Sequence, residues 1–276
     1  MIIEAINPRV LYIDLSKKRY WVEERGDLVE EWLGGVGLAV QLLKEEGVSR
    51  VDPLSPDNPI VLAVGPFNVL YPMGSKTVAL FRSPLTGNLG ESYAGGRSSF
   101  AIRLAGYTAI VIRGGSENPV YVAVHGNKVR FRDARALWGM SSSITVGRVI
   151  REVEPGAGVR TIMRIGPAGE KLVRYACVVT ETYRHFGRLG LGAVFGAKKL
   201  KALVISGRGS IKVRDRSSYR EIYDRIYREA LSGPMAKYHE LGTAMNVLPL
   251  NNMGALPTRN LTSGRFEHAE EISGEA

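Results

Sequence analysis

The chain has 276 residues, 45% of them hydrophobic, and a formal net charge of +10. This length allows one large domain or two smaller ones, and no run of about 18 or more apolar residues predicts a membrane span. The N-terminus lacks the basic and apolar regions of a secretory signal. We therefore expect a cytoplasmic protein without a membrane partner.

The basic residues stand singly among predicted strands and turns instead of forming a block. A polyanionic small ligand, an acidic partner and a merely solvated basic surface all stay open, whereas the absence of an aromatic RNA-binding motif argues against nucleic acid. The single cysteine, Cys177, excludes a disulfide within the chain and is expected to be a small buried residue. One thiol cannot supply the four ligands of an iron–sulfur cluster.

The first segment predicts a hairpin, VLYIDLS and RYWVEE, around a turn at Lys17. The next stretch, DLVEEWLGGVGLAVQLLKEEG, is helical at both ends but is interrupted by glycines, which are poor helix formers. We expect a short helix, a glycine turn and a second helix from about Leu38 to Glu46.

One pattern then occurs twice: a strand ending in Gly-Pro, a second strand, a glycine-rich turn, a short helix and a closing strand. The first copy reads IVLAVGP, TVALF, YAGGRSSF and AIVIRG, and the second reads TIMRIGP, LVRYACVV, FGRLGLGAVF and ALVISG. Amides at a helix N-terminus bind phosphate, and glycine lets that backbone approach closely. The repeat therefore predicts two related anion sites in a two-fold arrangement, although glycines that only permit tight turns would look the same.

Between the copies, PVYVAVHG and KVRFRDA predict a hairpin, and residues 134–154 predict a helix in which Trp138 is a packing residue. After Gly207, SSYREIYDRIYREALSG has apolar residues at helical spacing. We expect this helix to begin with a capping box of Ser218 and Glu221, to end at Gly233-Pro234, and to be part of a core. A domain boundary near residues 209–214 follows, giving domains 1–210 and 211–276.

Three basic residues are candidates for binding an anion. Lys76 follows Gly74-Ser75, while Arg184 and Arg188 flank Gly187 and could clamp a diphosphate, because arginine pairs bidentately with phosphate. Solvated surface positions are the alternative for all three. His185 could act as a base, but no carboxylate partner is identifiable, and no P-loop, nucleophile elbow or H-E-x-x-H occurs. The residues thus point to an anion site without an evident reaction centre.

These motifs resemble the tungsten-dependent aldehyde ferredoxin oxidoreductase family. In order, they are SPLTG (83–87), AGG (94–96), AGYTAIVIRG (105–114), IGPAGE (165–170) and R-x-x-G-R-x-G-x-G-A-V-x-G-x-K-x-L-K-A (184–202). WLGGVGLA and VDPLSP near the start fit as well, as do ELGTAMNV and SGEA near the end. The resemblance covers essentially the whole chain but only the first part of a family member.

The resemblance implies an enzyme that oxidises aldehydes with water to carboxylic acids and passes two electrons through a [4Fe-4S] cluster to ferredoxin. Its metal, usually tungsten, would be held by the dithiolenes of two pterins whose phosphates are bridged by magnesium. It also implies an α+β fold: an N-terminal domain of two pseudo-two-fold-related halves of mixed β-sheet and helix, which binds the tungstopterin, followed by the start of an α-helical domain.

Matched by motif, the backbone carbonyls of Tyr93 and His185 are the expected magnesium ligands. Tyr93 replaces a smaller polar residue, which a role of the backbone tolerates. Lys76 matches a basic residue between cluster and pterin where arginine can stand; lysine keeps the charge but loses the planar fork. The expected cofactor-binding set is Lys76, Tyr93, Ala94, Gly95, Gly96, Arg184, His185, Gly187 and Arg188.

The main departure is the ending, because the family's cluster cysteines and acid–base residues come after the last residue of this sequence. We therefore expect no catalytic residue in this chain and no turnover by it alone. The expected partners are ferredoxin, the aldehyde, and a remaining C-terminal portion or a complementary subunit, with a homodimer left open. The alternative from another class is a truncated, non-catalytic scaffold or binding subunit that uses the basic surface.

Overall fold

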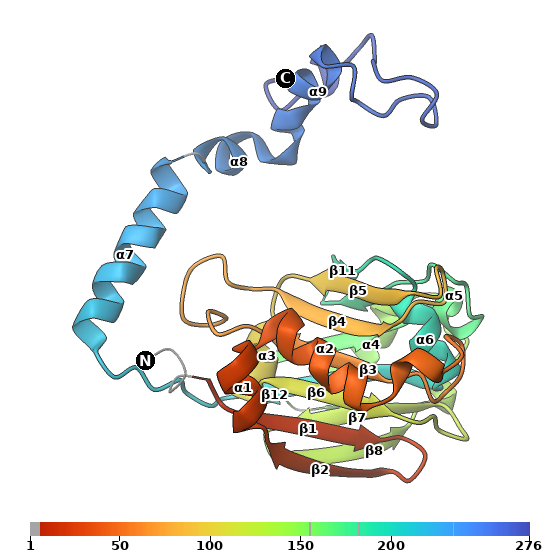
Figure 1. Ribbon diagram of the computed structural model, residues 1–276. Coiled ribbons are helices and arrows are strands. Elements are labelled where there is room, and N and C mark those ends of the chain that lie inside the picture. The colour runs from red at the N-terminus through yellow and green to blue at the C-terminus, as the bar shows by residue number, and fades with distance from the viewer. Residues whose placement is uncertain (1–5, 155, 182, 234) are drawn as a thin grey trace. The chain divides into compact units, whose positions relative to one another are not determined.

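The computed structural model describes residues 6–154, 156–181, 183–233 and 235–276, which form two compact units, 1–213 and 214–276 (Figure 1). Each unit is described by itself. Within the described ranges no helix combines the length and the apolar character that a membrane crossing requires.

The first unit is built on two six-stranded mixed sheets with the same connectivity. In the first sheet the strand order is β2-β1-β6-β3-β4-β5, and in the second it is β8-β7-β12-β9-β10-β11. In both, the first strand of the opening hairpin pairs in parallel with the last strand of the half, and all other pairs are antiparallel. The strands are β1 (Arg9–Asp14), β2 (Arg19–Glu24), β3 (Ile60–Val64), β4 (Thr77–Arg82), β5 (Leu89–Ala94), β6 (Ala109–Arg113), β7 (Val120–His125), β8 (Lys128–Asp133), β9 (Val159–Arg164), β10 (Val178–Thr180), β11 (Arg184–Phe186) and β12 (Leu200–Gly207).

This matching order confirms the two related halves and shows that the repeat is larger than its glycine motifs. Each hairpin, β1-β2 and β7-β8, belongs to its half, whereas the sequence placed the second hairpin between the copies. The halves therefore run from β1 to β6 and from β7 to β12.

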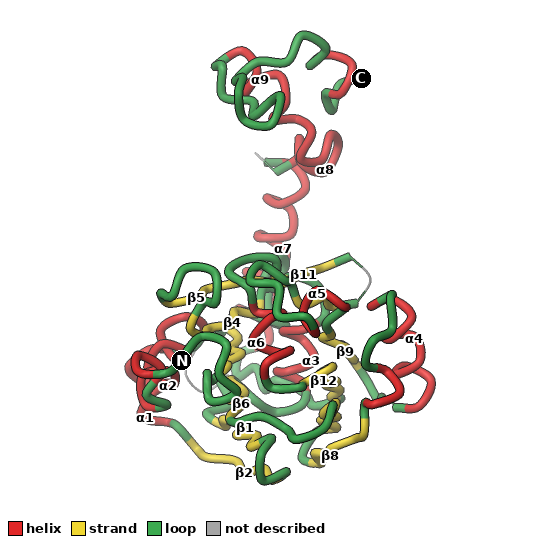
Figure 2. The backbone as a smooth tube through the Cα atoms, turned by 90° about the vertical axis from the view of Figure 1, so that its right-hand side faces the viewer, coloured by secondary structure: helices red, strands yellow, loops and turns green. Residues whose placement is uncertain are grey.

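The core of the unit lies in layers, because the strands alternate between two buried faces. In β1, Leu11 and Ile13 belong to the large core cluster shared by both sheets, whereas Val10 and Tyr12 pack with α1 (Gly26–Trp32) and α2 (Gly35–Glu45). The outer face of the second sheet is covered in the same way by α4 (Ser143–Val153). Between the sheets lie the two short helices α3 (Ser98–Leu104) and α6 (Leu191–Ala197), as Figure 2 shows.

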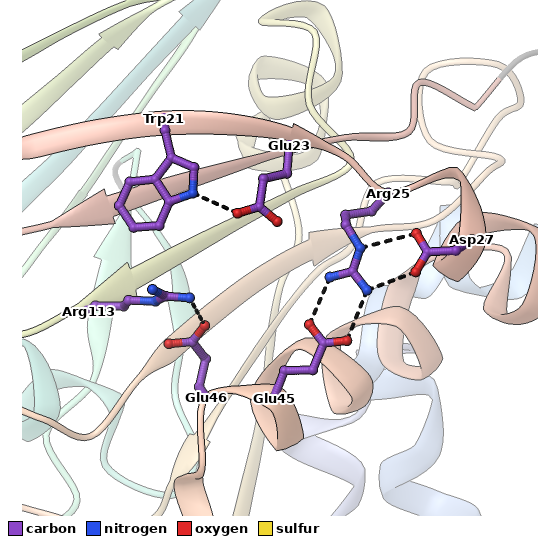
Figure 3. A network of polar contacts seen from close by, with 7 residues as sticks. All are labelled: Trp21, Glu23, Arg25, Asp27, Glu45, Glu46 and Arg113. Carbon is purple, nitrogen blue, oxygen red and sulfur yellow. Dashed lines mark hydrogen bonds and ion pairs between the residues drawn. The ribbon is translucent and has the colours of Figure 1, made fainter.

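Ion pairs fasten the outer helices to the first sheet (Figure 3). The Arg25 guanidinium donates to both carboxylate oxygens of Glu45, at 2.8 and 2.9 Å, and also to Asp27. Arg113, on β6, pairs with Glu46 at the end of α2. Bidentate arginine–carboxylate pairs of this kind fix orientation, so they set the position of α2 on the sheet.

Two lysines of the last motif are fully buried. Lys198 Nζ donates to the carbonyl oxygens of Pro56 (2.7 Å) and Gly114 (2.9 Å), so it joins the second half to the first, and burial lowers its pKa to about 7. Lys201 forms an ion pair with Glu170, the last residue of α5 (Pro167–Glu170). These lysines hold the fold together and do not face a ligand.

Four local expectations are corrected. Helix α2 begins at Gly35, before the expected Leu38, because the positive φ angles of the glycine turn are confined to Gly34 (140°) and Gly35 (57°). Residues 134–154 form the short 3₁₀-helix η3 (Arg135–Leu137) and then α4, instead of one helix. The strand expected over LVRYACVV shortens to β10, because its first part turns to pack on the start of α6, where the Gly192 amide donates to the Ala176 carbonyl. As a result Cys177 is only half-buried.

The second unit consists of short helices: α7 (Arg216–Ser232), α8 (Ala236–Leu241), η4 (Gly242–Asn246), α9 (Val247–Asn252) and η5 (Glu270–Ile272). Helix α7 is capped by Asp215, whose carboxylate accepts from the amides of Ser217 and Ser218, so the expected capping box of Ser218 and Glu221 is wrong. The helix ends at Gly233 as expected, and Pro234 lies outside the described residues.

The expectation that α7 is part of a core is also wrong, because none of its described residues is buried. Its tyrosines instead form a ladder on one face, with Tyr223 and Tyr227 stacked at a centroid distance of 6.4 Å. The other short element, η2 (Val48–Arg50), belongs to the first unit.

Candidate functional site

The two glycine-rich turns follow strands that lie at corresponding edges of the two sheets. β5 ends at Ala94 and leads through Gly95 and Gly96 to α3, and β11 ends at Phe186 and leads through Gly187 to α6. The edge strands β5 and β11 are neighbours in space (Figure 1). The two turns therefore both lie where the halves meet, as a two-fold arrangement requires.

Two contacts show how these strands cross. A Cβ added to Gly96 would lie 3.3 Å from Cγ of Arg184, and at the other end the Arg188 amide donates to Ser92 Oγ at 3.1 Å. The residues that follow each strand therefore lie against the other strand, and the two strands run in opposite directions. In the register that these contacts set, Ala94 lies opposite Phe186, so Tyr93 and His185 lie on either side of this central point.

Tyr93 and His185 also occupy equivalent places in their own sheets. Tyr93 pairs with Val78 of β4, His185 pairs with Val179 of β10, and each is the residue before the last of its strand. On an edge strand, alternate carbonyls point away from the sheet and have no strand partner. The backbone at these two positions is thus suited to bind one ligand symmetrically.

Lys76 comes to the first glycine turn although it lies before β4. A Cβ added to Gly95 would stand 3.7 Å from its ammonium nitrogen, so the charge lies directly beside the turn. Gly96 has a φ of +85°, a conformation that favours glycine, and Ala94 and Gly95 are buried beneath the surface. The Lys76 ammonium and the backbone of this turn together form a positively charged site that could bind an anion.

The second turn is open. A Cβ added to Gly187 would meet no atom within 4 Å, and its neighbours Arg184 and Arg188 are both exposed. The Arg184 guanidinium carbon lies 5.3 Å from the ring centre of Tyr183. The structure therefore places Lys76 and Arg184 at the first glycine turn, and Arg188 in the second turn at the other end of the crossing.

Among the described residues, the side chains of Tyr93 and His185 are not arranged as a proton shuttle. Tyr93 donates its hydroxyl to Glu91, and burial together with this hydrogen bond raises its pKa to about 12, so the phenol keeps its proton. His185 is exposed, and among the described residues no carboxylate is hydrogen-bonded to its ring.

Side chains alone offer no metal centre in the described part of the chain, where no group of three His, Cys, Asp or Glu residues is gathered. A cation at the crossing would have to be bound by backbone carbonyls and by groups of its ligand.

The site also includes a residue that the sequence did not reveal: Glu181, whose carboxylate lies against Gly96 from the opposite sheet. No local pattern marks it, because the contact joins distant segments.

Two family models match the chain. The aldehyde ferredoxin oxidoreductase N-terminal domain matches residues 10–207, and domains 2 and 3 of the same family match residues 220–276.

Curated relatives agree with these matches. The chain is 38% identical over 97% of its length to a tungsten-containing aldehyde ferredoxin oxidoreductase of Thermococcus kodakarensis, and 36% identical to that of Pyrococcus furiosus. It is 31% identical to the WOR-like subunit of an aliphatic sulfonate oxidoreductase of Pyrococcus furiosus. The chain spans 45% of the length of each of these relatives.

A solved structure shares the fold. The active-site complex BamBC of benzoyl coenzyme A reductase, in complex with 1,5-dienoyl-CoA, superposes with a TM-score of 0.76 at 30% identity. The match covers 82% of this chain and 34% of that chain.

Proposed function

The chain belongs to the aldehyde ferredoxin oxidoreductase family, and from this membership we propose that its first unit is the base on which a bis-pterin tungsten cofactor binds. The observation that carries the proposal is the crossing of β5 and β11, where two glycine turns, two equivalent backbone positions and three cationic side chains come together. A cofactor made of two similar pterins calls for a protein surface with the same two-fold repetition.

The residues present fit such a group. Phosphates need amide donors and cations, which the glycine turns and Lys76, Arg184 and Arg188 provide. A magnesium ion needs oxygen ligands and keeps some of its water, and the carbonyls of Tyr93 and His185 are at equivalent places to serve it. The open space beside Gly187 leaves room for a ligand at the second turn.

In this proposal each residue has one task. Arg184 and Arg188 bind the phosphates by charged hydrogen bonds, each worth about 1.5–3 kcal/mol. Lys76 neutralises negative charge beside the first turn, while Ala94, Gly95, Gly96 and Gly187 keep the backbone close to the ligand. Tyr93 and His185 contribute carbonyl oxygens, so their side chains can vary.

The reaction proposed for the whole protein is R–CHO + H₂O → R–COOH + 2 H⁺ + 2 e⁻, with ferredoxin as the electron acceptor through a [4Fe-4S] cluster. When bound, the tungsten cofactor supplies the oxidising centre that takes up the two electrons. This sequence has one cysteine, so it does not contain the thiolate set of the cluster. The contribution of the first unit is to bind and orient the cofactor.

Aldehydes are the preferred substrate class because the relatives at 36–38% identity are named for them. The relative named for aliphatic sulfonates is only 31% identical, although the same share of it is covered. A scaffold role based on the basic surface gains no support from a specific contact.

The test is cofactor retention. The double variant Arg184→Ala and Arg188→Ala, made in the protein produced anaerobically with tungstate, is expected to lose pterin and tungsten while keeping its circular dichroism spectrum. The matched control is Arg148→Ala and Arg151→Ala, two exposed arginines on α4. Unchanged pterin and tungsten in the first variant would refute the site.

A further inference from the structure

Glu181 reaches the cofactor site from the opposite half. It follows β10 directly, and its Oε2 lies 3.0 Å from the place where a Cβ on Gly96 would stand. Gly96 belongs to the turn after β5. A carboxylate of the second sheet is therefore placed on the glycine turn of the first.

The carboxylate is held in a fixed orientation. The hydroxyl of Thr161 donates to Oε1, and the hydroxyl of Thr180 donates to Oε2 at 2.7 Å. Both threonines are buried, at 1% and 0% exposure, so neither donor can turn away to water. Each carboxylate oxygen keeps lone pairs for one further partner.

Its charge has no partner in the described part of the chain. No lysine, arginine or histidine described there forms an ion pair with Glu181. The buried Arg164 feels its field but donates to the carbonyls of Ser143 and Ile162. A half-buried carboxylate without a counter-ion favours binding of a cation.

The backbone at Glu181 is also unusual. Its φ is +45°, at the tight turn between β10 and β11, where glycine or asparagine is the ordinary choice. A non-glycine residue in this region is strained, because its Cβ comes close to the following carbonyl oxygen. A strained residue beside the glycine turn points to a role of its side chain.

Resting on the proposed function, we propose that Glu181 accepts hydrogen bonds from the water carried by the magnesium ion and so retains the hydrated cation at the carbonyls of Tyr93 and His185. The register that sets His185 opposite Gly95 also puts Glu181 against the next residue, Gly96. Magnesium gives up its water reluctantly, so a fixed carboxylate nearby binds it through that water. This charge repels the phosphates of the cofactor and attracts a cation at the same turn, where Cγ of Arg184 also lies against Gly96.

The experiment measures magnesium per tungsten by elemental analysis in the purified holoenzyme during a timed challenge with EDTA. The variant is Glu181→Gln, which keeps the shape and removes the charge. The control is Glu117→Gln, an exposed carboxylate in the segment between the halves. We expect Glu181→Gln to lose magnesium at least tenfold faster than the wild type and the control, while pterin and tungsten stay bound at the start of the challenge.

Equal loss of magnesium from Glu181→Gln and wild type would overturn this inference and leave the proposed function intact. A wild-type protein without pterin and tungsten would instead overturn the proposed function, and the inference with it. If Glu181→Gln retained no pterin, Thr161→Val would decide, because it releases one carboxylate oxygen and keeps the charge. Faster magnesium loss in that variant supports the inference, and an unchanged rate overturns it.

Discussion

Two glycines of the site are predicted to fail in different ways when they become alanine. Gly96 has a φ of +85°, and its added Cβ would lie 3.0 Å from Glu181 and 3.3 Å from Arg184. Gly187 is not in the left-handed region, and its added Cβ would meet nothing within 4 Å. Gly96→Ala should therefore damage the fold, whereas Gly187→Ala should damage only the binding of a ligand.

The magnitudes follow from this geometry. An alanine held at positive φ costs about 1–3 kcal/mol, and a chain of this size loses about 2–4 °C of Tm per kcal/mol. At position 187 the backbone accommodates alanine, and the smaller entropy of the unfolded chain raises stability by about 0.4–1 kcal/mol. The new methyl group would, however, occupy the space assigned to the cofactor.

The assay compares Tm, measured by differential scanning calorimetry without cofactor, with the pterin content of protein produced with tungstate. Gly26→Ala is the matched control, because its Cβ also meets open space but lies at the start of α1. We expect Gly96→Ala to lower Tm by several degrees, and Gly187→Ala to keep Tm while losing most of its pterin. Full pterin content in Gly187→Ala, with Gly26→Ala also full, would refute the placement of the cofactor at the second turn.

Three further predictions concern stability. The side chain of Glu154 is 1% exposed, and burial alone would raise its pKa, but hydrogen bonds from His125, Tyr121 and Arg132 lower it. The ionised carboxylate therefore stabilises the fold fully above the unfolded pKa of about 4.3, and this stabilisation is lost as pH falls through the folded pKa. Glu154→Gln should lower the free energy of unfolding in urea by about 3–5 kcal/mol at pH 7, and should make stability depend less on pH below about pH 5. An unchanged urea midpoint at pH 7 would contradict this. Burial lowers the pKa of Lys198 to about 7 in the fold, whereas the unfolded lysine stays protonated up to about pH 10.4, so stability should rise with pH between these values. Lys198→Met should remove that rise, seen as a flat Tm from pH 7 to 9. Asp215→Ala should destabilise α7 by about 1 kcal/mol, because the carboxylate that accepts hydrogen bonds from the amides of Ser217 and Ser218 is lost. Circular dichroism of this chain measures the loss of helix, and unchanged helicity would contradict the role of Asp215 as the cap.

The strands and turns of the repeat were predictable because their signals are local. The runs IVLAV and AIVIR become β3 and β6, which are buried on both faces and therefore consist almost entirely of apolar residues. The glycine turns before α3 and α6 were visible for the same reason, since Gly96 and Gly190 in them take a positive φ that favours glycine. The candidate set around the turns is thus largely a product of local sequence.

Other features depend on contacts between distant segments, which local patterns do not encode. Parallel pairing of β1 with β6, and of β7 with β12, makes each hairpin part of its half. No pattern in the hairpin sequences predicts this pairing. The sequence does not predict that Lys198 is buried, because lysine is ordinarily a surface residue. The start of α7 was misplaced because Asp215 and Ser218 are both good caps, and only the backbone conformation selects the first.

The two halves share one topology, so the differences between them identify what is specific to each cofactor position. In the first half a loop, residues 83–88, joins β4 to β5, and the hydroxyl of Ser83 in it donates to the Leu189 carbonyl of the second turn. In the second half a tight turn joins β10 to β11, and Glu181 stands in it. Each connection thus reaches across to the glycine turn of the other half, one with a neutral hydroxyl and the other with a charge. Because the charge is present on one side only, the proposed cation would be held asymmetrically, and the two pterin positions of the proposed site would not be electrostatically equivalent.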